Sequence, residues 1–244
     1  MTDAHCHIAR GETRHFLCEP LAGAPGRDDA VFCGTHPWHL DGFDAAALRA
    51  RLAEDPAAGV GEIGLDRLRA RDIPARMRAV FEAQLKLAAE FRRPVVLHGA
   101  KCWGEVVRTV RRIDPARRIP ALLFHGFSRA DGLVPDIVAL NGYISVGPAL
   151  LNDHAVNYRR LAQAIPGDRL LVESDATAAN AAEVPSVAAV AAKLAELRGL
   201  PAEALAARLE SNAEAFLGSR QGSRAAAGGP SAEIGKGGGT CEEC

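Results

Sequence analysis

Two histidines near the start of the chain, His5 and His7, have a spacing that suits a metal ion. Side chains two residues apart on a β-strand point to the same face, so both imidazoles could grip one cation, with Asp3 one layer below them. A lone His-x-His pair is weak evidence, because histidines at strand ends are also satisfied by hydrogen bonds. The prediction of a metal site therefore depends on ligands elsewhere in the chain.

Further metal-binding side chains accompany short apolar runs of the sequence. They are His36, Glu62, His98, His125 and Asp175. Each has an ordinary alternative, as a histidine bonded to backbone carbonyls or a carboxylate that caps a helix. In a parallel barrel, however, the carboxyl ends of all strands meet at one rim, where active sites are built. We therefore predict that these residues become neighbours.

The predicted ligands are too many for one tetrahedral ion. They are His5, His7, Glu62, His98, His125 and Asp175. They suit two divalent ions about 3.5 to 4 Å apart that share a carboxylate and a bridging water. Imidazoles with carboxylates favour zinc, manganese, iron or cobalt, and magnesium is a less natural occupant. Two such ions lower the pKa of the water, so the predicted reaction is hydrolysis.

The elements that must position these residues alternate along the chain. Apolar runs typical of buried parallel strands occupy 1–5, 31–34, 59–63, 94–97, 121–124, 143–146 and 170–172. Helix-period stretches occupy 44–53, 74–91, 103–112, 156–165 and 186–198. A weaker run at 15–18 would be the eighth strand, so we predict an α/β fold of the (β/α)₈ TIM-barrel type. An open doubly wound sheet is the alternative.

Composition sets the broad class. The chain has 244 residues, 48% of them apolar and 24% charged, with a net charge of −1, as in an ordinary globular protein. This balance provides no global positive field for coating nucleic acid. The sequence lacks a membrane-length apolar run and a leader-like start, so we expect a cytoplasmic location, no membrane contact and no obligate protein partner. We expect one domain over 1–218 and a flexible glycine-rich tail over 219–244, whose Cys241 and Cys244 make a weak metal site.

Several motifs resemble the TatD family of metal-dependent hydrolases, amidohydrolase-like TIM barrels known for deoxyribonuclease activity. The matching segments are Asp3-Ala4-His5-Cys6-His7, Gly34-Thr35-His36-Pro37, Gly61-Glu62-Ile63-Gly64-Leu65-Asp66, Val96-Leu97-His98, His125-Gly126-Phe127-Ser128, Gly142-Tyr143-Ile144-Ser145, Glu173-Ser174-Asp175 and Asn212-Ala213. Their order and spacing cover the chain from Thr2 to Leu217.

The resemblance implies roles for these residues. One metal would be held by His5, His7, Glu62 and Asp175, and the other by Glu62, His98 and His125. Glu62 and Asp175 would be catalytic, with Asp175 accepting a proton from the attacking water. His36 would bind substrate near the phosphate, and Asp66 and Glu173 would orient the metal ligands.

The chain also departs from the family pattern. Only 28 residues separate His7 from His36, so we expect the barrel to be trimmed near its second strand. Lys101 stands where the family carries a Ser-Arg pair after His98, and could bind phosphate in its place. Ala176 and Thr177 follow Asp175 where the family has proline.

We therefore expect a deoxyribonuclease that acts on DNA ends or nucleotide-type substrates. Two alternatives remain: a hydrolase of small amides, esters or phosphoesters on the same site, and a metal-binding barrel without turnover. An arginine run could guide a strand of nucleic acid; it comprises Arg67, Arg69, Arg71, Arg76 and Arg78. Trp38 and Phe127 are the candidates for base stacking, whereas we expect Trp103 in the core.

Overall fold

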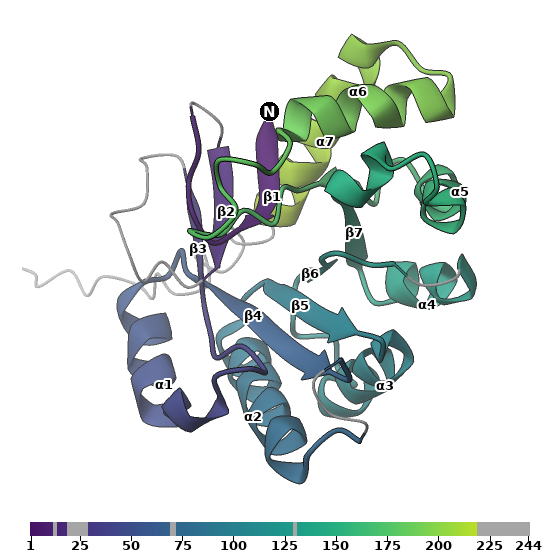
Figure 1. Ribbon diagram of the computed structural model, residues 1–244. Helices are drawn as coiled ribbons and strands as arrows, with labels where there is room; N and C mark the ends of the chain where they lie inside the picture. The colour runs from purple at the N-terminus through teal and green to yellow at the C-terminus, as the bar shows by residue number, and fades with distance from the viewer. Residues whose placement is uncertain (12–13, 19–28, 69–71, 129–130, 219–244) are drawn as a thin grey trace, which may run out of the picture.

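The computed structural model describes residues 1–11, 14–18, 29–68, 72–128 and 131–218. Eight strands pair in sequence order, and every pairing is parallel (Figure 1). The predicted barrel, including its weak second strand, is confirmed. The strands are β1 (Thr2–Cys6), β2 (Arg14–Cys18), β3 (Ala30–Cys33), β4 (Gly59–Asp66), β5 (Val95–Ala100), β6 (Leu122–Phe124), β7 (Gly142–Val146) and β8 (Leu170–Val172).

Helices follow the strands from β3 onward and lie around the outside of the sheet (Figure 1). They are α1 (Ala45–Glu54), α2 (Ala75–Phe91), α3 (Trp103–Ile113), α4 (Val134–Ala139), α5 (Val156–Ala164), α6 (Val187–Arg198) and α7 (Ala202–Gly218). Short 3₁₀ turns occupy Leu40–Gly42, Asp131–Leu133 and Pro148–Leu151. The described residues between β1 and β3 form no helix, which agrees with the trimming expected there.

Alternation along the strands divides the apolar side chains into two layers. Val96, Leu123 and Leu171 pack together inside the barrel, where Phe216 of α7 stacks on Phe16. Their neighbours in sequence, such as Leu97 and Phe124, pack outward in the helix-covered layer. Side chains on the same face of a strand recur every two residues. Positions 98, 125 and 173, each two residues beyond one of these inner residues, therefore also face the barrel interior.

The barrel is nearly closed where β1 lies beside β8. The Asp175 amide donates to the His5 carbonyl at 3.1 Å, and the His7 amide donates to the Ala176 carbonyl at 2.8 Å. These bonds join the two chain segments that carry His5, His7 and Asp175. Closure of the barrel therefore also assembles one part of the predicted site.

The helices of the described part include none long and apolar enough to cross a bilayer. The predicted tail over 219–244, with Cys241 and Cys244, lies outside the described residues. The flexible tail and the cytoplasmic location stay predictions.

Candidate metal centre

An irregularity in β4 aims Glu62 into the barrel. The register of β4 against β5 shifts between Val60 and Ile63, and both of these residues pack in the outer apolar layer. A regular strand puts residues three apart on opposite faces. The shift therefore lets Val60 and Ile63 face outward while Glu62 faces the interior, as β-bulges beside active sites do.

A similar shift in β1, between Asp3 and Cys6, separates Asp3 from the metal-binding residues. The Asp3 carboxylate accepts hydrogen bonds from the Ser174 amide at 2.9 Å and the Ser174 hydroxyl at 2.5 Å. His5 instead faces Glu62. The expectation that Asp3 and His5 point the same way is wrong, because the shift interrupts the two-residue alternation.

Glu62 lies at the middle of the centre, and its two oxygens face different imidazoles. Oε2 is 3.4 Å from Nε2 of His5 and 3.3 Å from Nε2 of His7. Oε1 is 2.5 Å from Nδ1 of His98 and 2.6 Å from Nε2 of His125. Burial opposes ionisation of Glu62, but His125 and His5 outweigh it and hold the pKa of Glu62 well below its usual range. One ionised carboxylate is thus shared by two pairs of imidazoles.

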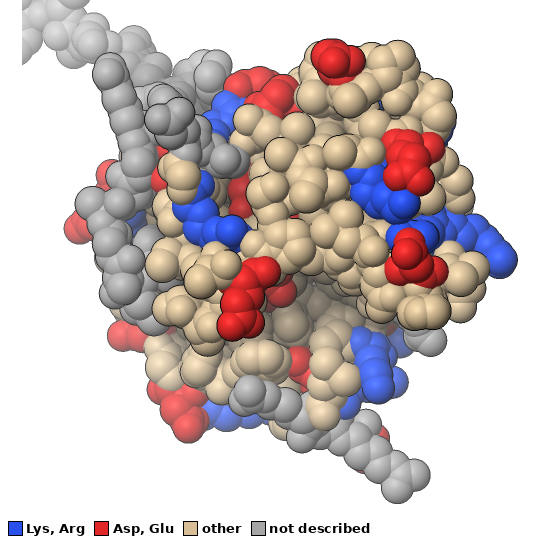
Figure 2. Space-filling model, turned by 45° about the horizontal axis from the view of Figure 1, so that its top comes forward, with Lys and Arg blue, Asp and Glu red and all other residues tan. Residues whose placement is uncertain are grey.

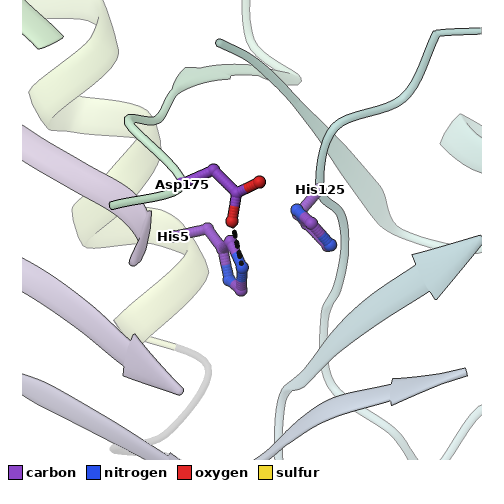
Figure 3. A group of neighbouring side chains, drawn as sticks. All are labelled: His5, His125 and Asp175. Atoms are coloured by element: carbon purple, nitrogen blue, oxygen red, sulfur yellow. Dashed lines mark ion pairs between the residues drawn. The ribbon is translucent and has the colours of Figure 1, made fainter. Parts of the chain in front are cut away.

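Asp175 approaches His5 from the segment after β8, with His125 facing the pair from the other side (Figure 3). Its Oδ1 is 3.5 Å from Nε2 of His5, and its side chain is 54% exposed. Burial raises the pKa of Asp175, but the close contact with His5 and the charges of His5 and His125 bring it below its usual range. The backbone of Asp175 has φ of 54°, a conformation that Asp tolerates better than most residues. Asp175 is therefore an ionised carboxylate open to solvent.

Hydrogen bonds on the far ring nitrogens fix which nitrogen of His7 and His98 faces Glu62. Nδ1 of His7 donates to the carbonyl of Cys18 at 3.1 Å, which leaves the Nε2 lone pair toward Glu62. Nε2 of His98 donates to Oδ2 of Asp66 at 3.0 Å, which leaves the Nδ1 lone pair. A carboxylate or carbonyl on the far nitrogen is the usual support of a metal-ligating histidine. Both residues are therefore arranged as ligands.

His36 has the opposite arrangement. Its Nδ1 accepts the backbone N–H of Trp38 at 3.1 Å, so the ring hydrogen of neutral His36 is on Nε2, 3.4 Å from Oε1 of Glu62. Burial lowers the pKa of His36 and outweighs the effect of Glu62, which keeps the ring neutral at pH 7. A nitrogen that carries hydrogen donates rather than ligates. This geometry suits the substrate-facing role expected for His36 better than a metal ligand.

The ligand atoms of the cluster, including the ring nitrogens of His5, are suited to bind divalent ions. Neither ring nitrogen of the fully buried His5 makes a hydrogen bond of ordinary geometry to any residue that the structure describes. Buried polar groups are nearly always bonded, so these two ring nitrogens call for a partner such as a metal ion. Three groups of ligand atoms each lie within 4.8 Å of one another: His5 with His125 and Asp175, His5 with His7 and Glu62, and His36 with Glu62 and His98. All six predicted ligands are thus brought together.

Asp66 and Glu173, the two residues predicted to orient the metal ligands, contact His98 and His125 from outside the cluster. Glu173 accepts the amide of Gly126 at 2.7 Å and the hydroxyl of Ser145, which fixes the chain next to His125. Gln84 of α2 is a third supporting residue, which was not predicted from the sequence. Its amide group bonds both the N–H and the carbonyl of Thr35, at 2.6 and 3.1 Å, beside His36. A glutamine within a helical repeat carried no distinguishing pattern.

Glu62 and His98 lie within strands, whereas we expected them at strand ends. We expected the fourth strand to end at 63, but β4 continues to Asp66, and β5 extends past His98 to Ala100. Glycine weakens the strand pattern at Gly64, yet a Cβ there would lie 2.0 Å from the His98 carbonyl. The close approach of β4 and β5 at the site therefore requires the residue that obscured the strand.

The predicted phosphate contacts are less complete. Lys101 follows β5 with an exposed side chain and φ of 55°, and no ion pair or hydrogen bond of the described residues joins its side chain to the cluster. Arg67 and Arg78 both pair with Glu105, and Arg76 lies 3.5 Å from Asp41. Arg69 and Arg71 lie outside the described residues. On the face drawn in Figure 2, basic and acidic side chains are interspersed rather than gathered into one basic area.

An α/β barrel whose interior rim gathers imidazoles and carboxylates around a shared glutamate has the architecture of a metal-dependent hydrolase. Residues 21–218 match the family described as TatD related DNase. The chain belongs to the TatD family of metal-dependent hydrolases.

Individual relatives agree with this assignment. A protein of Cronobacter sakazakii named 3'-5' ssDNA/RNA exonuclease TatD is 32% identical over 148 residues, covering 59% of this chain and 55% of that protein. Its namesake from Edwardsiella piscicida is 34% identical over 162 residues, covering 66% of this chain and 58% of that protein. The chain therefore spans less than two thirds of either relative. The crystal structure of YJJV, a TatD homologue of Escherichia coli K12, superposes with a TM-score of 0.74 at 25% identity, covering 88% of this chain and 96% of that one.

Proposed function

We propose that this chain is a nuclease that hydrolyses phosphodiester bonds at DNA ends with two divalent ions. The observation that carries the proposal is that the two carboxylate oxygens of Glu62 face different pairs of imidazoles. Oε2 faces His5 and His7, while Oε1 faces His98 and His125. A buried carboxylate shared in this way suits a pair of ions better than one. The choice of DNA is supported by the family and by the relatives named as single-stranded DNA and RNA exonucleases.

The proposed holders of one ion are His5, His7, Glu62 and Asp175, and those of the other are Glu62, His98 and His125. Zinc, manganese, cobalt, iron or magnesium could be the bound metal. When bound, such ions supply Lewis acidity toward water and phosphate oxygens.

The remaining chemistry falls to Asp175 and His36. Asp175 is ionised and half-exposed, so its carboxylate can accept a proton from an attacking water. Neutral His36 presents a buried Nε2–H toward the cluster, where it can donate to a phosphate oxygen of the substrate. Lys101, exposed at the end of β5, would add a positive charge for more distant phosphates.

The test is hydrolysis of end-labelled single-stranded and duplex DNA by protein stripped of metal and reloaded with each candidate ion. We expect ladder-like shortening of single strands that requires metal and weakens as salt rises. Asp175→Asn should abolish most of this hydrolysis. The matched control is Asp168→Asn, which changes an exposed aspartate two residues before β8. Release of no nucleotide with any metal would overturn the proposal.

A second candidate, hydrolysis of small amides, esters or phosphoesters, is favoured by the surface charge. The described arginines beside β4 are paired with Glu105 and Asp41, so they offer little free charge to a nucleic-acid strand. Assays of the same preparations with small amide, lactone and phosphoester substrates separate the two functions. Turnover of these alone would assign the second function.

A further inference from the structure

Trp38 differs from every other aromatic residue of the chain. Its side chain is 43% exposed, whereas the remaining tryptophan, the tyrosines and the phenylalanines are buried or half-buried. Phe127, the other residue considered for stacking, is fully buried, and Trp103 packs in the core against Phe124. A large exposed apolar ring needs an explanation when it stands beside a cluster of polar groups.

The indole of Trp38 is held in place by the metal centre itself. Its Nε1 donates to Oδ2 of Asp66 at 2.7 Å, the oxygen that also accepts from His98. Its backbone amide donates to Nδ1 of His36 at 3.1 Å. The ring stands nearly perpendicular to His36 and His98, with centroids 4.7 and 6.1 Å away. Trp38 is therefore both exposed and fixed, which lowers the entropy cost of binding a flat partner.

A second exposed apolar residue depends on the same carboxylate. Oδ1 of Asp66 accepts the backbone amide of Leu68 at 2.5 Å, and the Leu68 side chain is also exposed. The two oxygens of one buried aspartate thus position two solvent-facing apolar side chains next to His98. The exposed apolar side chains at the end of β4 are therefore anchored by hydrogen bonds to a buried residue, unlike those of a solvated loop.

We propose that Trp38 is a stacking platform for a nucleobase of the substrate, next to the phosphate that lies over the metal centre. The proposal rests on the nuclease function and deepens it by naming a base-binding residue. Every base has a π-face, so stacking there binds single strands with little sequence preference. An unpaired end can offer its base to Trp38, whereas a paired base inside a duplex cannot, so the residue would also favour single-stranded ends.

The test compares Trp38→Leu, which removes the aromatic face, with Trp38→Phe, which keeps one. Substrates are an oligodeoxythymidylate and an abasic oligomer of equal length. Trp38→Leu should raise KM for the oligodeoxythymidylate about 5- to 150-fold with a smaller change in kcat, which is the range for one lost stacking contact. Trp38→Phe should recover most of this loss, and the abasic oligomer should not distinguish the three proteins. Metal content, measured for each variant, controls for indirect effects through Asp66.

Fluorescence gives a readout that does not require turnover. In a Trp103→Phe, Asp175→Asn background Trp38 is the sole tryptophan. The oligodeoxythymidylate should quench the tryptophan fluorescence, while the abasic oligomer should not. Equal effects of both oligomers on fluorescence, together with an unchanged KM in Trp38→Leu, would overturn the stacking role and leave the nuclease function intact. If no oligonucleotide is cleaved by the wild type, the nuclease function falls, and the quenching result still decides whether Trp38 binds bases.

Discussion

The two oxygens of Glu62 face sides of the centre that differ in exposure and support. On the open side, formed by Oε2 with His5, His7 and Asp175, the side chains of His7 and Asp175 are 27% and 54% exposed, whereas that of His5 is fully buried. On the supported side, formed by Oε1 with His98 and His125, the corresponding values are 13% and 9%. The carboxylates of Asp66 and Glu173 lie beside the supported side only.

This difference separates two tasks that one centre must perform. Ligands that are buried and backed by carboxylates lose little freedom on binding an ion, so the supported side is preorganised to retain one. The open side admits solvent next to an ionised carboxylate, so water and substrate can enter there. We infer that the supported side holds its ion more tightly, whereas the open side carries the proton transfer.

The largest effect should come from Glu62→Gln, because Glu62 belongs to both sides. An amide offers one oxygen and no charge, so both donor groups lose their shared anion. We expect metal content to fall on both sides and activity to drop by more than about 10⁴-fold, beyond the range for one general base. Elemental analysis with rate measurements checks this, and Glu203→Gln, at an exposed position of α7, is the matched control. Retention of full metal content would refute the shared role.

Asp175→Asn should affect catalysis more than metal retention. The amide keeps an oxygen toward the open side but cannot accept a proton, so activity should fall about 10²- to 10⁴-fold. The ion on the supported side should remain. Metal content and single-turnover rates, measured on one preparation, distinguish this outcome from collapse of the centre. Ordinary turnover in the variant would assign the proton to another group.

Asp66→Asn should weaken the supported side by a smaller amount. The change removes the negative charge behind His98 while leaving its shape, and loss of such a partner costs about 10- to 100-fold in metal affinity. Competition with a chelator measures the affinity of each ion. A matched control is Asp153→Asn, whose carboxylate pairs with Arg159 at the surface. Equal loss of both ions would mean that the two sides are not independent.

The smallest effect concerns pH. Burial and His5 oppose protonation of His125, but Glu62 and Glu173 outweigh them and raise the pKa of His125 from 6.5 to about 9. Burial also opposes protonation of His5, but Cys18 and Glu62 outweigh it and raise the pKa of His5 well above its usual value. At pH 7 protons must therefore leave both rings before ions bind, so metal affinity should rise by at least about tenfold per pH unit up to about pH 9.

For the metal-free protein, folding stability should change with pH in the opposite direction, falling as the pH rises. A group with a raised pKa in the folded state stabilises the fold fully below its unfolded pKa, and this contribution is lost as pH rises through its folded pKa. Melting of the chelated protein should therefore shift to lower temperature between pH 6.5 and 9. A metal-free melting temperature that increases over this interval would contradict the assignment of the raised pKa to His125.

Much of the barrel could be predicted because strands and helices leave local patterns. Apolar runs marked the strands, and the three-to-four-residue repeat marked α1, α2, α3, α5 and α6, whereas α4 and α7 were not predicted. The length of β4 was underestimated, since Gly61 and Gly64 weaken a pattern based on side chains. The missed Gln84 acts only across the space between α2 and the loop at Thr35, which no local repeat records.

The sequence by itself determined the residue types of the centre and their order along the chain. Strand ends of a parallel barrel must converge, so one group could be predicted from the sequence alone, comprising His5, His7, Glu62, His98, His125 and Asp175. Only the tertiary structure decided the direction of each side chain and the far-nitrogen partners, which leave His98 with a lone pair toward Glu62 and His36 with a hydrogen. The physical reason is that register shifts and hydrogen bonds between distant residues are set by packing of the whole barrel, which local sequence does not encode.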